Sequence, residues 1–216
     1  MKLAHGVIAI AMALGLARPA LADLQFDYFR AIQLDSADEV RRLLGKVDPN
    51  LPSPVTGEPP LVLALREDAV KVFEVLLAHP AIRIEQTAPN GNNALMMAAF
   101  RHHKPAVLAL LAKGAAVNRA GWSALHYAAA SGDDDICNIL LAHKAAINAP
   151  ARGLLTPLMM AAREGHESTV RLLLAAGADA RLTDSDNQSA LQIAIKADKP
   201  AIAQAISAHL GSTAKP

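Results

Sequence analysis

The sequence predicts an all-α solenoid of six stacked helix–turn–helix repeats joined by short hairpin loops. An apolar anchor recurs at intervals of 33, 34, 30, 33 and 33 residues, an alanine follows each anchor by three positions, and an apolar pair begins fifteen positions after it. A period near 33 residues indicates a stacked-repeat architecture. The anchors are Tyr28, Leu61, Leu95, Leu125, Leu158 and Leu191; the alanines are Ala31, Ala64, Ala98, Ala128, Ala161 and Ala194; the pairs begin at Leu43, Leu76, Leu110, Leu140, Leu173 and Ile206.

The repeats fill most of the chain. We place them at about 24–50, 55–85, 88–118, 119–148, 151–180 and 184–210, with a short tail over 211–216. In the clearest unit, Ser123 is placed to cap a first helix that Gly132 ends, and Asp133 to Asp135 put negative charge at the start of a second helix. Two helices of about ten residues are each marginal alone, so they must bury their apolar stripes against each other and the next pair.

Composition supports close helix packing and argues against nucleic-acid binding. Hydrophobic residues make up 52% of the 216 residues but aromatic residues only 3%, so the core is built from alanine and leucine. The recurrent alanine leaves room for one methyl group where two helices cross, and a larger side chain there would cost ~1–3 kcal/mol. The formal net charge is +1 and the sequence has no long basic run, so it lacks the concentrated positive charge that is typical of nucleic-acid-binding proteins.

The first 22 residues resemble a secretory signal. Lys2 precedes an apolar run over residues 6–16, and Ala20-Leu21-Ala22 forms a small-x-small cleavage site before Asp23. The apolar run is short for a membrane span, although an uncleaved anchor is the alternative. We therefore expect a chain exported to the periplasm of a bacterium and free of the membrane after cleavage.

Cys137 is the single cysteine, so an internal disulfide is excluded. It lies twelve positions after its anchor, where the other repeats carry small or medium apolar residues. We interpret it as a buried hydrophobic side chain rather than a nucleophile. The equivalent residues are Val40, Phe73, Val107, Val170 and Ala203.

Two units carry a resemblance to a known family. The segments that carry it are GWSALHYAAASGDDDICNILLAHKAAIN and LLTPLMMAAREGHESTVRLLLAAGADA, and both resemble ankyrin repeats. The resemblance covers about residues 24 to 210 and implies paired helices stacked in an arc, with projecting loops and a concave binding face. The matching residues are Ser123, Leu125, His126, Ala128, Ala129, Gly132, Leu140, Leu141 and Asn148 in one unit, and Thr156, Pro157, Leu158, Ala161, Ala162, Gly165, His166, Leu173, Leu174, Gly177, Ala178 and Asp179 in the next.

Departures from the repeat are informative. The first and last units are irregular, as terminal repeats with one face in water are expected to be. Lys144 stands where the neighbouring repeats have Gly114 and Gly177. We predict a positive φ at this position, which costs a residue other than glycine about 1 kcal/mol.

The resemblance implies that a ligand touches the loop tips and the exposed side of the first helices. Aromatic residues and arginines at such positions often dominate interfaces. The alternative for Trp122 and Phe100 is that they pack on neighbouring loops. The candidate protein-binding residues are Trp122, Tyr127, Phe100, Arg101, Arg66, Arg163, Met97 and Met160.

The interval of 30 residues before Leu125 is the shortest in the array. Three residues are missing between Asn118 and Trp122, so we expect a notch in the row of loops beside Trp122. A notch beside an exposed aromatic ring suggests a pocket for a side chain of the partner, although loops also tolerate changes of length without a function.

The sequence shows no recognisable enzyme motif, and we expect no catalytic residues, cofactor or metal. Met96-Met97, Met159-Met160 and His102-His103 include soft metal ligands, but adjacent residues on a helix do not face each other, and the methionine pairs are a whole repeat apart. His126 and His166 stand where the resemblance implies a structural, hydrogen-bonding histidine.

These patterns predict a monomeric protein-binding module without chemistry of its own. Its partner would be a protein, such as a periplasmic enzyme. Two alternatives stay open: an immunity or inhibitor protein for a toxin or hydrolase, and a protein that binds a metal or haem.

Overall fold

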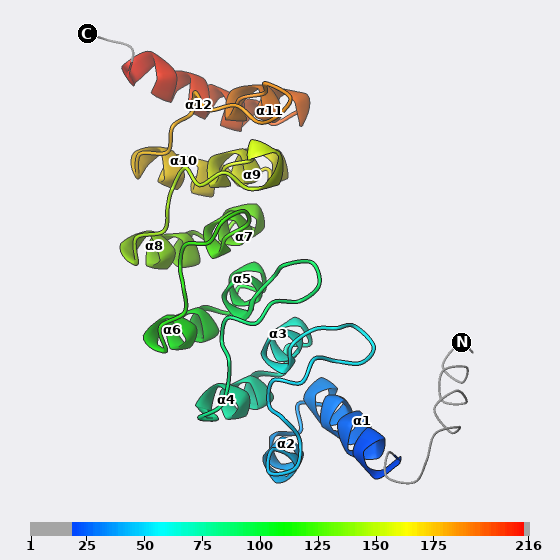
Figure 1. Cartoon of the computed structure of the whole chain (residues 1–216). Coiled ribbons are helices and arrows are strands. Elements are labelled where there is room, and N and C mark those ends of the chain that lie inside the picture. The colour runs from blue at the N-terminus through cyan, green and yellow to red at the C-terminus, as the bar shows by residue number, and fades with distance from the viewer. Residues whose placement is uncertain (1–18, 214–216) are drawn as a thin grey trace.

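The computed structural model describes residues 19–213, in which twelve α-helices run in pairs that stack into an arc. The first helix of each pair lies on the concave side and the second on the convex side (Figure 1). The first helices are α1 (Pro19–Gln33), α3 (Pro60–Arg66), α5 (Ala94–Phe100), α7 (Ala124–Ser131), α9 (Pro157–Glu164) and α11 (Ala190–Lys196). The second helices are α2 (Ala37–Leu43), α4 (Val70–Ala78), α6 (Lys104–Ala112), α8 (Asp134–Ala142), α10 (Glu167–Ala175) and α12 (Pro200–Thr213).

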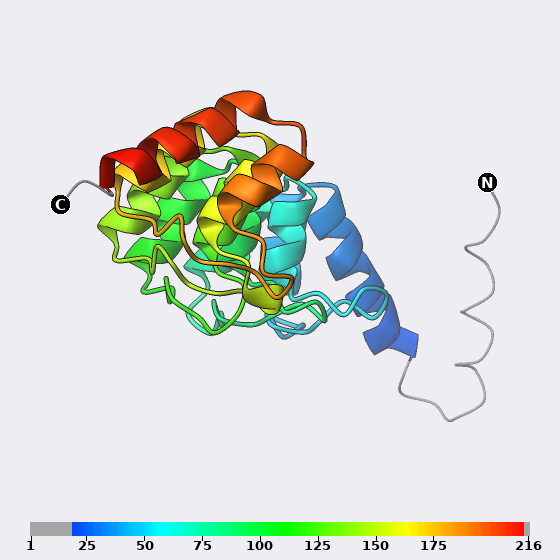
Figure 2. The same ribbon diagram turned by 90° about the horizontal axis from the view of Figure 1, so that it is seen from above.

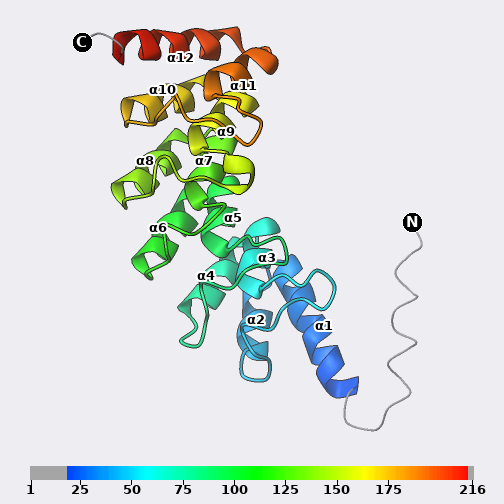
Figure 3. The same ribbon diagram turned by 45° about the horizontal axis from the view of Figure 1, so that its top comes forward.

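The predicted all-α solenoid is confirmed. The loops gather along one side of the stack (Figure 2), and α12 lies across its end (Figure 3). A short 3₁₀-helix, η2 (Arg152–Leu154), lies in the loop before α9, and Thr183 and Ser189 form an isolated antiparallel bridge in the loop before α11.

The recurrent apolar positions form the core between the two rows of helices. All six repeat alanines are buried, and so is the first residue of each apolar pair. Five of the six anchors are also buried, whereas Leu191 is only partly buried because its repeat ends the array. Cys137 is fully buried among them, as its place in the repeat predicts.

The turns inside and after the repeats use a left-handed backbone. Gly132 has φ of 74° at the end of α7, and Asp68 has φ of 59° at the equivalent turn of the second repeat. The predicted positive φ at Lys144 is confirmed, with 66° beside 88° for Gly114 and 96° for Gly177. Lys144 therefore occupies a conformation that favours glycine.

Asparagine side chains tie successive loops together. Asn118 donates from Nδ2 to the carbonyl of Lys144 at 2.8 Å and accepts from the backbone N–H of Ala146 at 2.7 Å. Asn50 makes the same pair of bonds to Ala81 and Arg83 in the next loop. These bonds hold successive loops in register.

The two ends of the array differ from the expected boundaries. Helix α1 begins at Pro19 and continues through the predicted cleavage point after Ala22, while the rest of the predicted signal lies outside the described residues. Helix α12 continues to Thr213, beyond the expected end of the last repeat at residue 210. Within residues 19–213, none of the helices is long and apolar enough to cross a membrane.

Candidate functional site

Three aromatic side chains meet on the concave side of the third and fourth repeats. Phe100 ends α5, Tyr127 lies in α7, and Trp122 lies in the loop just before α7. The ring of Tyr127 packs edge-on against Phe100, with centroids 5.9 Å apart, and is tilted against Trp122 at 6.0 Å. We call these three residues the aromatic cluster. The expectation that Tyr127 lies near the other two is confirmed.

A hydrogen bond fixes the orientation of Tyr127. Its hydroxyl donates to Oδ1 of Asn92, in the loop before α5, at 2.6 Å. Burial raises the pKa of the Tyr127 hydroxyl, so the hydroxyl stays protonated as a donor. The ring is half-buried, while Phe100 leaves 48% of its surface exposed. The cluster is thus held in place and still open to a partner.

His126 is a buried residue that supports the aromatic cluster from the core side. Its imidazole is fully buried, and Nδ1 accepts from the backbone N–H of Ser123 at 3.2 Å. The same Nδ1 lies 2.8 Å from the Ser123 hydroxyl, and Nε2 lies 3.0 and 3.1 Å from the carbonyls of Ala149 and Leu155. Nε2 therefore carries the proton. Burial lowers the pKa of the imidazole, which keeps it neutral, so His126 is a structural residue as the resemblance implies.

The loop into α7 is the shortest of the five between repeats, as predicted. It spans residues 113–123, eleven residues, whereas the other four have fourteen to sixteen. The loops into α3 and α5 project beyond the first helices, while the connection into α7 stays close to the stack (Figure 1). Trp122 thus lies in the shortest of the loops between repeats. A pocket at this point stays a prediction.

The fourth repeat also has small side chains near the end of its first helix. Five and six positions after the anchor, this repeat carries Ala130 and Ser131, between Phe100 and Arg101 of the third repeat and the charged pair of the fifth. Both small residues are half-buried. The surface around Tyr127 therefore lies between bulkier side chains of the third and fifth repeats.

The three candidate arginines differ in how they are engaged. Arg66 pairs with Glu58 and Glu67, both at 2.9 Å. Arg163 pairs with the neighbouring Glu164 at 3.0 Å, an exposed contact of little strength. Arg101 is exposed at the end of α5 and has no ion-pair partner among the described residues. Arg101 is therefore the arginine most free to meet an acidic partner.

The two candidate methionines differ in exposure. Met97 is half-buried and packs against the core, so part of it is available at the surface. Met160 was expected at the contact surface but is buried, with 7% of its surface exposed. Arg163 covers it, because its Nη2 lies 3.3 Å from the Met160 sulfur. Met160 thus offers a partner almost no contact.

The soft side chains do not gather into a site. Met96 and Met159 are buried on α5 and α9, and α7 packs between these two helices. Among the described residues, no group of three or more histidine, cysteine or acidic side chains is arranged to hold a metal. His102 instead bridges to Asp133 of the next repeat at 3.0 Å, and His103 accepts from the first turn of α6.

Sequence patterns missed two supports of this site. The bond of Asn92 to Tyr127 could not be read from the repeat, because the two residues belong to different units. Ser123 caps the start of α7 in a capping box with His126, as expected, but the 2.8 Å contact of its hydroxyl with the His126 ring was not expected. Histidine follows the anchor in this repeat alone, so the available signal was the resemblance, which implies a structural histidine at His126.

Comparison with known proteins points in one direction. The family model described as ankyrin repeats (3 copies) matches residues 81–151, and the one described as ankyrin repeats (many copies) matches residues 140–194. Together they cover more than half of the chain. Similar proteins include human SH3 and multiple ankyrin repeat domains protein 1, 34% identical over 145 residues, which are 64% of this chain and 7% of that protein.

Two further relatives are similar over part of the chain. Human transient receptor potential cation channel subfamily A member 1 is 29% identical over 160 residues, 68% of this chain and 14% of that protein. Human BCL-6 corepressor-like protein 1 is 38% identical over 108 residues, 48% of this chain and 6% of that protein. The chain thus spans only a small part of the length of each of these relatives.

Proposed function

The chain belongs to the ankyrin-repeat family, and we propose that it binds a protein partner through its concave face, with the aromatic cluster at the centre of the contact. The observation that carries the proposal is the meeting of Phe100, Trp122 and Tyr127 beside the shortest loop between repeats, next to Arg101, which has no ion-pair partner among the described residues. Aromatic residues and arginines at the centre of an interface commonly contribute most of its binding energy.

The construction of the site supports binding without rearrangement. Tyr127 is fixed by its bond to Asn92, and Trp122 rests on the buried His126. Side chains already held in one orientation lose less conformational entropy when a partner binds. The mechanism is therefore rigid presentation of a preformed surface rather than folding on contact.

We further propose that the protein works in the periplasm of a bacterium and that its partner is an exported protein such as a periplasmic enzyme. This rests on the sequence of the first 22 residues, with the apolar run over residues 6–16 and the Ala20-Leu21-Ala22 site. N-terminal sequencing of the protein from fractionated cells tests it. A chain beginning at Asp23 in the periplasmic fraction supports the proposal, and an intact chain in the cytosol contradicts it.

Capture from periplasmic extract with the mature protein tests the binding function. Wild type, Phe100→Ala and Trp122→Ala are compared, with Phe26→Ala as the control because Phe26 is also an exposed phenylalanine but lies on α1, away from the cluster. The captured protein is then purified and titrated. We expect each of the two cluster substitutions to raise the dissociation constant at least ~10-fold, which corresponds to a loss of more than about 1.4 kcal/mol of binding free energy.

The same titration separates two roles. If the captured protein is an enzyme whose activity is abolished at nanomolar concentrations of the chain, the chain is an inhibitor. If the activity persists or rises, it is a companion protein. Equal affinity for wild type and both cluster variants would contradict the assigned site.

A further inference from the structure

The convex side carries a second surface with an unusual composition. Helix α6 has the sequence KPAVLALLA, in which every residue after Lys104 is apolar. A helix that is apolar all round is normally buried. Yet Leu108 leaves 44% of its surface exposed, and Pro105 and Ala112 are exposed on the same outward row. This row lies opposite the aromatic cluster and is independent of the proposed binding site.

The other repeats provide an internal comparison for Leu108. Thirteen positions after the anchor, all five other repeats carry a polar or charged residue, and the third repeat alone carries leucine. The equivalent residues are Arg41, Glu74, Asn138, Arg171 and Gln204. Since this position is exposed in every repeat and polar in the other five, Leu108 is the exception on the convex side.

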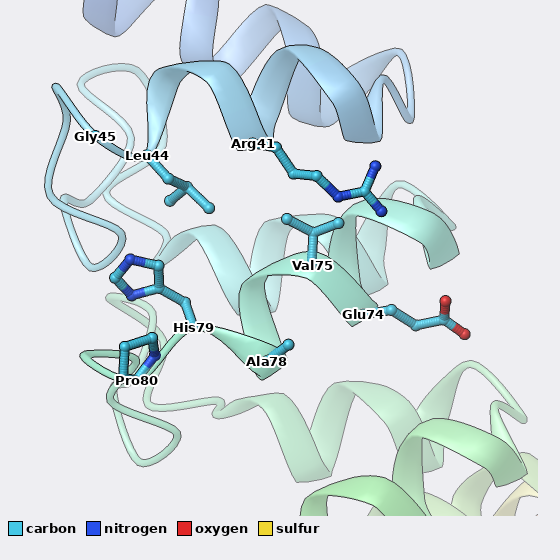
Figure 4. Close-up of a pocket in the computed structure, with 8 residues that line it drawn as sticks. All are labelled: Arg41, Leu44, Gly45, Glu74, Val75, Ala78, His79 and Pro80. Carbon is cyan, nitrogen blue, oxygen red and sulfur yellow. The ribbon is translucent and has the colours of Figure 1, made fainter.

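A groove lies beside the neighbouring helix α4 (Figure 4). It runs between α2 and α4 and has a volume of about 570 Å³. Leu44, Val75 and Ala78 give it an apolar lining, while Arg41 and Glu74 lie near one end. A second groove of about 290 Å³, lined largely by apolar side chains, lies on the other side of α4 towards α6. Helix α4 is thus a ridge between two grooves.

We propose that this surface, formed by α4, α6 and the two grooves, binds a second copy of the chain. Two-fold dimers are the commonest assemblies of soluble proteins, and they need a surface that is complementary to itself. Helix α4 meets this need, because an antiparallel copy of the same helix presents the same side chains in reverse order. The proposal departs from the monomer that the sequence predicts.

The charges on α4 are also complementary to themselves. Lys71 and Glu74 are both exposed, stand one turn apart, and have no ion-pair partners among the described residues. When two copies of α4 pack antiparallel across a two-fold axis, Lys71 of each copy lies opposite Glu74 of the other. The pairing satisfies four charges at once and places the two apolar α6 rows within the same contact.

Charge exchange tests this arrangement directly. The variants Lys71→Glu and Glu74→Lys each place like charges opposite one another, which is destabilising. We expect analytical ultracentrifugation to show a wild-type dimer and, for each single variant, at least ~10-fold weaker dimerisation. An equimolar mixture of the two variants restores complementary pairs, so it should form a mixed dimer. The double variant should also dimerise.

The apolar contact is tested separately. Leu108→Gln introduces the residue that the sixth repeat carries at this position, and it should weaken the dimer at least ~10-fold. Leu154→Gln is the matched control, because Leu154 is an exposed leucine in the loop before α9, away from α4 and α6. Circular dichroism checks that each variant stays folded. A wild-type chain that is monomeric up to ~100 µM, or single variants that dimerise as wild type does, would overturn the proposal.

Discussion

The imidazole of His126 lies edge-on beneath the indole of Trp122, with 5.4 Å between the ring centroids and 76° between the ring planes. His126 is fully buried and bonds to backbone carbonyls in the loop before α9, whereas Trp122 is only half-buried. The contact therefore joins the proposed binding surface to the core of the stack. Changes at Trp122 should affect both binding and stability, but to different extents.

We expect Trp122→Ala to lower the free energy of unfolding by about 1–2 kcal/mol, because it removes ring contacts worth about 0.5–1.5 kcal/mol each. Urea unfolding of the variant measures this loss, and Phe26→Ala should stay within about 0.5 kcal/mol of wild type. The fold should survive, so that binding can be compared in the same protein. A loss above ~4 kcal/mol would place Trp122 among the core residues instead.

The buried His126 should make stability depend on pH. Its pKa is lowered by burial from the ordinary value of 6.5. The unfolded chain therefore binds a proton near pH 6.5 that the folded chain does not take up until the pH is lower. The stability that this neutral imidazole supports is complete above pH 6.5 and is lost progressively as the pH falls from that value to the lower pKa of the folded protein.

Comparison with His126→Gln isolates this effect from the other histidines. Between pH 7.5 and 5.5, wild type should lose stability by up to about 1.4 kcal/mol per pH unit more than the variant does. Urea unfolding at several pH values measures the difference. Parallel pH profiles for the two proteins would show that His126 is protonated in the folded state as easily as in the unfolded one.

The repeat pattern predicted the fold because each position serves the same purpose in every unit. Ala98, Ala128 and Ala161 are buried at the same helix crossings, and the positive φ of Lys144 follows from glycine in its neighbours. What the pattern could not predict are contacts between residues of different units that do not repeat, such as Tyr127 with Asn92. The burial of Met160 is of the same kind, since it depends on where Arg163 lies.

The aromatic cluster was only partly predictable for a related reason. The spacing placed Phe100 and Trp122 at the surface and Tyr127 near them, because successive first helices stack side by side. The apolar row of α6 was visible in the sequence as well, since Leu108 breaks a polar position. The sequence could not show that two grooves lie beside the neighbouring helix α4, whereas the structure does.

Cys137 should be unreactive while the protein is folded. It is fully buried, and burial together with Asp134 and Asp133 raises the pKa of its thiol to about 12. The thiolate is the reactive form, so almost none is present at pH 8. Labelling with a chromogenic disulfide reagent should be negligible in buffer and complete in urea. Rapid labelling of the folded protein would contradict the buried position.

Gly132 should tolerate a side chain less well than Gly114. Both have positive φ, at 74° and 88°, so alanine at either position costs about 1 kcal/mol. A Cβ at Gly132 would also lie 2.4 Å from the His166 ring, whereas one at Gly114 meets nothing within 4 Å. We expect Gly132→Ala to cost about 1–3 kcal/mol more than Gly114→Ala in urea unfolding. Equal losses would mean that His166 moves aside freely.

Lys144→Gly should stabilise the protein by up to about 1 kcal/mol. Lys144 is exposed and has φ of 66°, a conformation that costs a side-chain-bearing residue about 1–2 kcal/mol and glycine almost nothing. The greater freedom of glycine in the unfolded chain offsets part of this gain. The backbone carbonyl of Lys144 still accepts from Asn118 in the variant, so the tie between loops is kept.

Ala176→Gly provides the control for this gain, because Ala176 is exposed at the end of α10 but has φ of −79°. Glycine at this φ relieves no backbone strain and only adds conformational entropy to the unfolded chain. The free energy of unfolding should therefore fall by roughly 0.5–1 kcal/mol. Urea unfolding should therefore move the two variants in opposite directions. A lower melting temperature for Lys144→Gly than for wild type would show that the lysine side chain contributes contacts that outweigh its backbone strain.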